Sequence, residues 1–452
     1  MLKVLHVPFT FAPDPVGGTE IYVESLSRHL RSHGVESIIA APSATGVDET
    51  YEWTGLRVHR YRYARRSNRM LRELYGEGDP EAARAFAEIL DAVEPDVVHL
   101  HALSRAVSVL SVKAAKARGI PVLFTYHTPV VSCRRGTLMY HGTHVCDGRL
   151  DVQRCTECSL ANSGLPKWIA APLSHMPSSV ARALERAELN SGIWTALRMA
   201  DLVQVSAQCF HDLMREVDVV VALRHWVKAL LLRNNVPSSK IVSSPHGLAD
   251  GGTREQNRIS PDTSPLRVAF RGRADRTKGI DTLIKAVIAA REIDVALDLY
   301  GVAQSSGDEE YRTKLVDLAG QDSRIRFLPP IPHDRVVPTL GNYHLVAVPS
   351  RWMETGPLVV LEAFAAGTPV IGSNLGGIAE WVRNGENGLL VEFDDVAGWS
   401  RALKRCARDR ALLAALGKGI ESPRSMATVA EEMARLYQRH SIMSVDRQSC
   451  LQ

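Results

Sequence analysis

The sequence predicts an α/β fold made of two Rossmann-like domains, and three observations support this. Short strands rich in Val, Ile and Leu alternate with amphipathic helical segments, which is typical of a mostly parallel sheet covered by helices. The 452 residues exceed what one hydrophobic core usually holds, so more than one domain is expected. Between the two sets of strands lies Asp250–Pro265, which is polar, rich in turn formers and almost free of aliphatic residues. This composition is typical of a linker.

The predicted strands fall into two sets of similar size. The first half contains Lys3–Val7, Ser37–Ala41, Arg57–Arg60, Val97–His101, Val122–Tyr126, Leu202–Ser206 and Ile241–Ser244. The second half contains Arg267–Arg271, Ala296–Tyr300, Ile325–Phe327, Leu345–Pro349, Val370–Ser373 and Leu389–Val391. Ligands of such sheets bind beyond the carboxyl ends of the strands, so functional residues are expected in the loops that follow them.

These elements give three predicted segments. The first domain is placed at residues 1–250, with a cysteine-rich insertion at about 131–165. The second domain is placed at 266–424. A C-terminal helix at 425–440 is expected to pack back on the first domain.

Composition excludes several classes of protein. Hydrophobic residues at 45% and charged residues at 23% are ordinary globular values, which excludes a disordered or fibrous chain. The 54 basic and 50 acidic residues leave a net charge of only +4, so no nucleic-acid partner is expected. No apolar run is long enough for a membrane-spanning helix, and the first residues lack the pattern of a signal peptide. We therefore expect a cytoplasmic protein.

Several common motifs are missing. The sequence has no G-x-G-x-x-G, no P-loop, no H-E-x-x-H and no G-x-S-x-G, which disfavours nicotinamide dehydrogenases, P-loop NTPases, zinc proteases and α/β-hydrolases. It also has no D-x-D, so the sequence offers no obvious carboxylate pair to hold a divalent metal on a nucleotide.

A helix with a single acidic residue is predicted after the strand that ends at Pro349. It is expected to begin at Pro357, because proline is favoured at the first helical position, and to stop at Gly367. Glu362 lies in its apolar middle, so its carboxylate should be partly buried and needs a hydrogen-bonding partner. Two interpretations stay open. Glu362 forms a structural ion pair, or it accepts hydrogen bonds from a diol such as a ribose.

The loop before this helix adds further candidate groups. Glu354 would face a second part of the same ligand. The helix N-terminus at Gly356–Leu358 can hold negatively charged oxygens.

A second candidate loop is Phe270–Gly279, directly after a predicted strand. Arg273 and Lys278 lie five residues apart where this loop opens a helix. Two such cations suit a diphosphate, the arginine through a bidentate fork and the lysine as a point charge. A solvated basic loop is the alternative, and Arg271 and Arg276 fit that description.

In the first half, the candidates are two glycines and three histidines. Gly17 and Gly18 precede a helix, where they either let backbone N–H groups approach a ligand or form a simple turn. His127 follows the last residue of a predicted strand, at the edge of the sheet where this fold binds its ligands. A structural role and a functional role both stay open for it. His99 and His101 alternate along one strand and share a face, which fits packing at the edge of the core better than a metal pair.

Four of the seven cysteines fall within 26 residues. Cys133, Cys146, Cys155 and Cys158 have the spacing C-x12-C-x8-C-x2-C, and C-x2-C is a common metal knuckle. A tetrahedral structural zinc site is predicted, with His141 and His144 as substitute ligands. An iron–sulfur cluster, free thiols and a redox disulfide remain open.

Residues 57–72 contain seven arginines and no acidic residue. Such a run is usually a solvated face. The alternative is a surface patch that contacts an anionic membrane peripherally or binds an anionic glycan.

The combination of these motifs resembles the retaining family 4 glycosyltransferases of GT-B fold. Glu354–Glu362, ETGPLVVLE, resembles their E-x7-E motif, and Arg273 with Lys278 resembles their diphosphate clamp. Four further segments match the family pattern, namely Gly17–Glu20, Arg31–Glu36, Gly376–Glu380 and Asn384–Val391. Gly356-Pro357 replaces the Phe-Gly that often follows the first glutamate, and His246 replaces a frequent asparagine.

The resemblance implies two domains facing across a cleft and transfer of a sugar from a nucleotide diphosphate-sugar to a glycan or lipid-linked acceptor. It assigns Glu362 to the ribose and Glu354 to the transferred sugar. Arg273 and Lys278 would stabilise the leaving diphosphate, so that transfer needs no metal. The remaining residues it implies are the donor-site residues Gly17, Gly18, Gly356 and Leu358, and His127 at the sugar site. A sugar-nucleotide epimerase and a non-catalytic carbohydrate-binding protein of the same fold are the alternatives.

Overall fold

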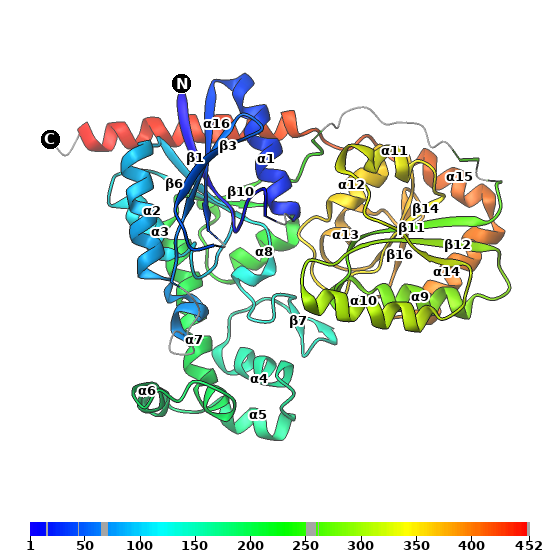
Figure 1. Cartoon of the computed structure of the whole chain (residues 1–452), viewed down its shortest axis with the longest axis horizontal. Coiled ribbons are helices and arrows are strands. Elements are labelled where there is room, and N and C mark those ends of the chain that lie inside the picture. Colours follow the sequence, from blue (N-terminus) through cyan, green and yellow to red (C-terminus); the bar gives the residue numbers. More distant parts are fainter. Residues whose placement is uncertain (15–16, 44, 65–70, 250–258, 261, 450–452) are drawn as a thin grey trace. The chain divides into compact units, whose positions relative to one another are not determined.

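The structure is a computed structural model that describes residues 1–14, 17–43, 45–64, 71–249, 259–260 and 262–449, with side chains described as far as residue 442. The chain forms two compact units (Figure 1). The first unit comprises residues 1–245 and 427–452, and the second comprises residues 246–426. Each unit is an α/β layer structure around one main sheet.

The main sheet of the first unit has eight strands in the order β10-β9-β6-β5-β1-β2-β4-β3. All neighbours pair in parallel except β3, which pairs antiparallel with β4 at the edge. The strands are β1 (Leu2–Val7), β2 (Val35–Pro42), β3 (Glu49–Trp53), β4 (Leu56–Tyr61), β5 (Val97–Leu100), β6 (Val122–Tyr126), β9 (Val219–Ala222) and β10 (Ile241–Ser243). Because β5, β6 and β9 are buried on both faces, their sequences are mainly apolar without alternation, and His99 and Thr125 are the polar exceptions.

The helices of the first unit fall into two groups. Those that accompany the sheet are α1 (Gly18–Leu30), α2 (Pro80–Val93), α3 (Val109–Lys116), α8 (His225–Arg233) and α16 (Met426–Ser449), with short turns at Arg31–His33, Glu73–Glu77 and Ser238–Lys240. The long segment between β6 and β9 contains the turn Pro129–Val131, the hairpin β7 (Met139–Tyr140) and β8 (His144–Val145), then α4 (Val152–Asn162), α5 (Lys167–Leu173), α6 (Ser178–Arg186) and α7 (Ile193–Glu216). Among the described helices, none is both long and apolar enough to cross a membrane.

The second unit is a six-stranded, wholly parallel sheet in the order β13-β12-β11-β14-β15-β16. The strands are β11 (Leu266–Arg273), β12 (Val295–Val302), β13 (Ile325–Phe327), β14 (Leu345–Val348), β15 (Val370–Ser373) and β16 (Gly388–Val391). Its helices are α9 (Ile280–Ala289), α10 (Ser306–Ala319), α11 (Val336–Leu340), α12 (Leu358–Ala365), α13 (Gly376–Trp381), α14 (Val396–Arg408) and α15 (Arg410–Lys418), with short turns at Arg276–Lys278 and His333–Arg335. Helices α9, α10, α14 and α15 bury one hydrophobic core against the sheet, and α11, α12 and α13 bury another (Figure 1).

The predicted α/β class with parallel sheets is confirmed, and one predicted strand is wrong. Leu202–Ser206 lies inside the 24-residue helix α7. In a five-residue window its apolar residues fit either period, and Leu202 and Val203 are buried on the inner face of that helix. The strand that completes this part of the sheet is β9, directly after α7. The predicted helix near Pro357 begins at Leu358, with Pro357 as its N-cap.

Candidate functional site

Two loops meet at the carboxyl edge of the second sheet because β11 and β14 are neighbours in it. The backbone N–H of Arg351, after β14, donates to the Thr277 carbonyl oxygen, after β11, at 2.7 Å. Gly279 has a φ of +66°, and a Cβ there would lie 2.0 Å from the carbonyl oxygen of Pro349. Only glycine permits this approach. The parallel sheet therefore brings together the two loops that the sequence singled out.

Lys278 and Glu354 form an ion pair between these loops. Lys278 Nζ lies 2.6 Å from Glu354 Oε1 and 5.2 Å from the centre of the Trp352 ring. The Ser350 hydroxyl and the Trp352 indole N–H also donate to Glu354 Oε1, each at 2.8 Å. The Glu354 side chain is only 6% exposed, so three donors compensate a nearly buried carboxylate oxygen.

Arg273 lies at the end of β11 with its side chain half exposed. Its guanidinium is 3.2 Å from the carboxylate of Asp275, which also caps the turn Arg276–Lys278. Both cations of the predicted diphosphate clamp thus lie on one loop, each beside a carboxylate.

Glu362, on α12, pairs with Arg271, on β11. Arg271 Nη1 lies 2.7 Å from Glu362 Oε2, and the glutamate side chain is 3% exposed. Burial is the largest effect and raises the pKa of Glu362 above its ordinary value, although the positive charge of Arg271 and its hydrogen bond partly offset the rise. The interpretation of Arg271 as a solvated surface charge is wrong, because its side chain is held against a buried carboxylate. Arg276 lies over the ring of Tyr311, 5.4 Å from its centre.

The turn before α12 is shaped by glycines. Gly356 has a φ of +156°, and a Cβ there would lie 2.6 Å from Nδ1 of His246 and 3.1 Å from the ring of Trp381. The N–H of Gly377, at the start of α13, donates to the Glu354 carbonyl oxygen at 2.6 Å. Leu358 packs at the margin of a small apolar cluster that includes Trp381. Close backbone packing against Glu354 therefore explains the Gly-Gly of the predicted motif.

In the first unit, the candidate histidines form a buried chain. His127 Nε2 is hydrogen-bonded to His101 Nδ1, and His101 Nε2 to His6 Nδ1, both at 3.1 Å. His99 is hydrogen-bonded to the Thr125 hydroxyl at 2.7 Å and to the Tyr437 hydroxyl of α16 at 2.6 Å. Burial lowers the pKa of His6 and of His127 to about 3 and the pKa of His99 and His101 well below 6.5.

Of these histidines, His6, His99 and His101 bring their ring nitrogens within 4.8 Å of one another. Both ring nitrogens of His99 already have protein partners. This arrangement agrees with packing at the core edge, the interpretation that the sequence favoured for His99 and His101.

Gly17 and Gly18 lie at the start of α1. Gly17 is its N-cap, in an extended conformation, and its N–H donates to the Glu20 carboxylate at 2.8 Å. The first turn of α1 is thereby capped within its own sequence, as in a capping box. A role of these glycines toward a ligand stays a prediction.

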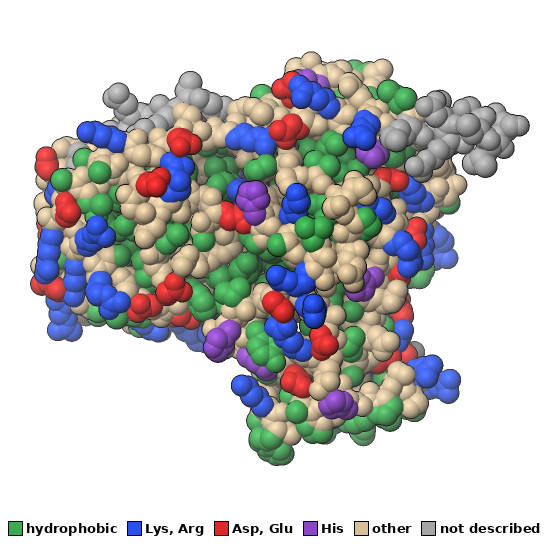
Figure 2. Space-filling view, turned by 180° about the vertical axis from the view of Figure 1, so that it is seen from behind, with side chains coloured by type: hydrophobic (Ala, Val, Ile, Leu, Met, Phe, Trp, Pro, Cys, Tyr) green, Lys and Arg blue, Asp and Glu red, His purple; other side chains and the backbone are tan. Residues whose placement is uncertain are grey.

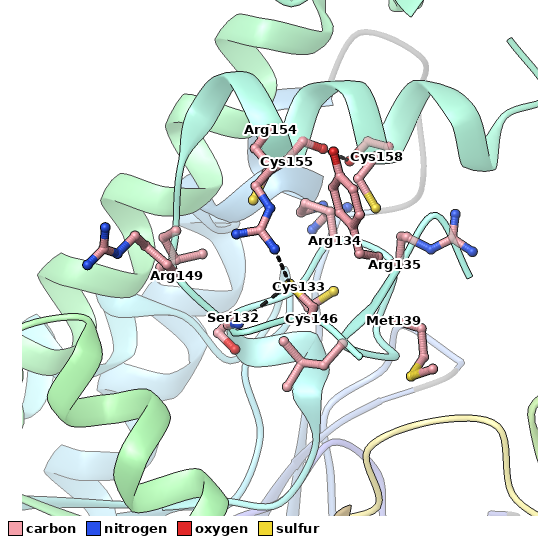
Figure 3. Close-up of a pocket in the computed structure, with 15 residues that line it drawn as sticks. Ser132, Cys133, Arg134, Arg135, Met139, Cys146, Arg149, Arg154, Cys155 and Cys158 are labelled. Carbon is pink, nitrogen blue, oxygen red and sulfur yellow. Dashed lines mark hydrogen bonds between the residues drawn. The ribbon is translucent and has the colours of Figure 1, made fainter. Parts of the chain in front are cut away.

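The four clustered cysteines line one pocket (Figure 3). Cys133 follows the turn after β6, Cys146 follows β8, and Cys155 and Cys158 lie on α4. All four are free thiols. Burial raises the pKa of Cys155 to about 12 and also raises the pKa of Cys146 and Cys158.

The arginines of residues 57–72 are mostly paired with acids where the structure describes them. Arg60 pairs with Asp14, Arg62 with Asp48, and Arg72 with Asp201. Arg65, Arg66 and Arg69 lie outside the described residues. On the face shown in Figure 2, basic and acidic side chains are interspersed. The predicted membrane contact therefore stays a prediction that depends on the undescribed part of this stretch.

Three residues that contact predicted ones were not predicted as site residues: His6 and Tyr437, and Arg271, which was interpreted as a solvated charge. His6 pairs in register with His99 across β1 and β5, so a strand alignment points to it. Arg271 faces Glu362 from 91 residues away, and Tyr437 reaches His99 from 338 residues away. Pairings at these separations leave no local sequence signal.

Comparison with known protein families identifies both halves of the chain. Residues 16–149 match the model of Glycosyltransferase Family 4, and residues 253–422 match that of Glycosyl transferases group 1. The chain belongs to the family 4 glycosyltransferases. Its motifs at Glu354, Glu362, Arg273 and Lys278 lie within the second match.

Curated relatives of this chain are similar to it over part of their length. The D-inositol 3-phosphate glycosyltransferase of Rhodococcus jostii is 40% identical over 173 residues, which is 37% of this chain and 38% of that protein. The protein of the same name from Corynebacterium efficiens is 36% identical over 188 residues, 40% of this chain and 44% of that protein. The aligned part thus spans about two fifths of these relatives.

Solved structures confirm the GT-B fold over the whole chain. Sucrose-phosphate synthase from Thermosynechococcus elongatus has a TM-score of 0.65 at 21% identity and covers 97% of this chain and 99% of that chain. The Anabaena protein HepE in complex with UDP and glucose has a TM-score of 0.62 at 15% identity, covering 97% and 100%.

Proposed function

We propose that this glycosyltransferase transfers a sugar from a nucleotide diphosphate-sugar to a glycan or lipid-linked acceptor, with retention of the anomeric configuration. The observation that carries the proposal is the pairing of Lys278 with Glu354 and of Arg271 with Glu362. The two cations lie on β11 or in the turn after it, and the two acids lie after β14, its neighbour in the sheet. Both acids of the E-x7-E motif are thereby buried and fixed in orientation. The relatives named above add an inositol phosphate as a candidate acceptor.

The second unit would bind the donor. Glu362 accepts hydrogen bonds from the ribose hydroxyls through the carboxylate that Arg271 orients. Lys278 and Arg273 exchange part of their present contacts with Glu354 and Asp275 for the donor phosphates. As the bond to the sugar breaks, negative charge builds on the diphosphate, and two cations already in place stabilise it with little reorganisation.

Glu354, in the second unit, would contact the transferred sugar. Glu354 has a fixed carboxylate at the loop between β14 and α12. The imidazole of His127 is neutral because burial lowers its pKa to about 3, so it would act as a hydrogen-bonding group and not as a cation. Neither the cysteine cluster nor a metal is required for this step.

The test uses the full chain with ADP-, UDP- and GDP-sugars, and separates binding from turnover. Lys278→Ala and Glu362→Ala should each abolish acceptor-dependent transfer. Lys285→Ala is the matched control, because the Lys285 side chain is half exposed. In the part of the chain that the structure describes, its ion pair is with Asp281, one helical turn away on α9. Wild-type turnover by either site variant would refute the site assignment.

The same assay distinguishes the alternatives. An epimerase would convert a sugar nucleotide without an acceptor, and a non-catalytic protein would bind the nucleotide without turnover. NMR of the product tests stereochemistry, since inversion at the anomeric carbon would overturn the retaining mechanism.

A further inference from the structure

The four clustered cysteines come from three separate segments that the fold brings to one pocket. Figure 3 shows Cys133, Cys146, Cys155 and Cys158 around it. Cys155 and Cys158 are one helical turn apart on α4, so both can face the same point. The backbone N–H of Cys146 donates to the Leu138 carbonyl at 2.8 Å, which holds Cys146 at the end of the β7–β8 hairpin.

Two of the sulfurs already accept hydrogen bonds from the backbone. The N–H of Gly148 lies 3.5 Å from Cys146 Sγ, and the N–H of His141 lies 3.3 Å from Cys158 Sγ. The Gly148 contact spans two residues and needs a φ of +75°, a conformation that glycine adopts without strain. Backbone N–H groups aimed at the sulfurs hold Cys146 and Cys158 in place and can remain as outer donors when these sulfurs bind a metal.

Basic side chains dominate the lining of the pocket, and the carboxylate of Asp147 lies beside it, where it accepts from the Cys146 thiol at 3.8 Å and pairs with Arg154 at 2.7 Å. The lining, all within the described residues, includes Arg134, Arg135, Arg149 and Arg154 and no carboxylate. Arg154 donates to Cys146 Sγ at 3.7 Å (Figure 3). A zinc ion with four thiolates carries a net charge of −2, which these guanidinium groups would compensate. A lining with thiols and no carboxylate disfavours the hard cations Mg²⁺ and Ca²⁺.

Hydrogen bonds from residues 147–150 to Arg233 and Asn234 tie one end of the segment around the pocket to α8, but its regular structure and apolar core are small. Between Ser132 and Asp151 the regular structure consists of two strands of two residues each. Leu138 and Met139 are its fully buried large apolar side chains in the described structure. Short segments with so small a core are commonly stabilised by a disulfide or a metal.

We propose that Cys133, Cys146, Cys155 and Cys158 bind one structural zinc ion that fixes the segment 132–158 onto the first unit. Among the described residues, the one set of three ligand atoms that lie within 4.8 Å of one another belongs to His6, His99 and His101. As a set, the sulfur atoms of the four cysteines are therefore farther apart than this and must move closer together to bind one ion. Rotation about χ1 moves each Sγ between staggered positions without moving the backbone, and metal binding supplies the free energy for closure. Each thiol releases its proton to solvent as its sulfur–zinc bond forms.

The experiment measures metal content and ligand identity in the full chain. Protein produced with zinc in the medium should contain about one zinc per chain by elemental analysis. Cys146→Ser and Cys158→Ser should lower that content at least tenfold. Cys209→Ser and Cys406→Ser are matched controls, since both cysteines are buried outside the cluster, and should keep the zinc.

A second set of measurements uses the wild-type chain, so it tests the proposal even if the cysteine variants do not fold. Cobalt bound to the wild-type chain should show the intense visible bands of a tetrahedral site and the near-ultraviolet thiolate charge-transfer band. Titrating the wild-type thiols with a mercurial should release the zinc as four thiols react. Iron in place of zinc, a metal-free wild-type protein, a cobalt spectrum without thiolate bands, or zinc retained in the cluster variants would overturn the proposal.

Discussion

The ion pair between Arg271 and Glu362 gives the sharpest test of the donor site, through Arg271→Met. Two unit charges about 4 Å apart attract by about 4 kcal/mol at an effective dielectric constant of about 20. Glu362 is 3% exposed, so solvent replaces little of this interaction when the guanidinium is removed. The variant leaves a buried carboxylate whose pKa burial already raises, and loss of Arg271 raises it further.

Protonated Glu362 can no longer accept two hydrogen bonds from the ribose diol. A hydrogen bond to a charged group contributes about 1.5–3 kcal/mol, so nucleoside diphosphate affinity should fall about 10- to 150-fold while the carboxyl is neutral. Affinity should recover as the pH rises through the raised pKa. Arg271→Lys retains the positive charge and should restore part of the affinity at all pH values.

The stability of Arg271→Met should change in the opposite direction with pH. A carboxyl whose folded-state pKa lies above its unfolded value, about 4.3, stabilises the fold below that unfolded value, and this contribution is lost as the pH rises through the folded pKa. Calorimetric titration with the nucleotide and denaturant unfolding, each from about pH 4 to pH 9, measure the two trends.

Arg326→Met is the control for this prediction. Arg326 pairs at 2.7 Å with Asp298, another buried carboxylate of the same sheet that lies outside the proposed donor site. Its loss should lower stability and leave nucleotide affinity unchanged. Affinity of Arg271→Met equal to wild type across this pH range would refute the role of Arg271 in keeping Glu362 ionised.

Three further predictions concern backbone fit, helix docking and pH. Gly356→Ala should lower the free energy of unfolding by about 1–3 kcal/mol and weaken nucleotide binding, because the new Cβ would collide with His246. Gly385→Ala is the control for backbone strain alone, because Gly385 has a φ of +83° and a Cβ there would have no atom within 4 Å. Equal losses of stability in both variants would contradict the steric argument. Tyr437→Phe should lower the free energy of unfolding in urea by about 1–3 kcal/mol, because the buried His99 loses its hydrogen bond to the Tyr437 hydroxyl on α16. An unchanged urea midpoint would argue against that contact. Burial lowers the pKa of the four buried histidines, so their contribution to stability should be complete above pH 6.5 and decrease as the pH falls below it, by at most about 1.4 kcal/mol per pH unit for each histidine. Denaturant unfolding at a series of pH values measures this trend, and a flat profile would show that the histidines are protonated at no cost.

Local sequence was enough for much of the fold and for the residue types of the donor site. Parallel strands buried on both faces, such as β9 and β14, are continuous apolar runs, and Pro357 marks the start of α12. Leu202–Ser206 was assigned wrongly because a five-residue apolar run fits both a strand and one face of a helix. Glu362 stood out because one charge in an apolar helix requires a partner.

The identity of that partner came only from the tertiary structure. Arg271 reaches Glu362 because β11 carries it to the face that α12 covers, and Lys278 reaches Glu354 because β11 and β14 are adjacent in the sheet. His6 joins His101 and His127 through strand register in the same way. The sequence by itself determined which groups are chemically able to act and that they follow strands. Which of them pair was decided by strand order and helix packing, since these bring together residues that no local pattern connects.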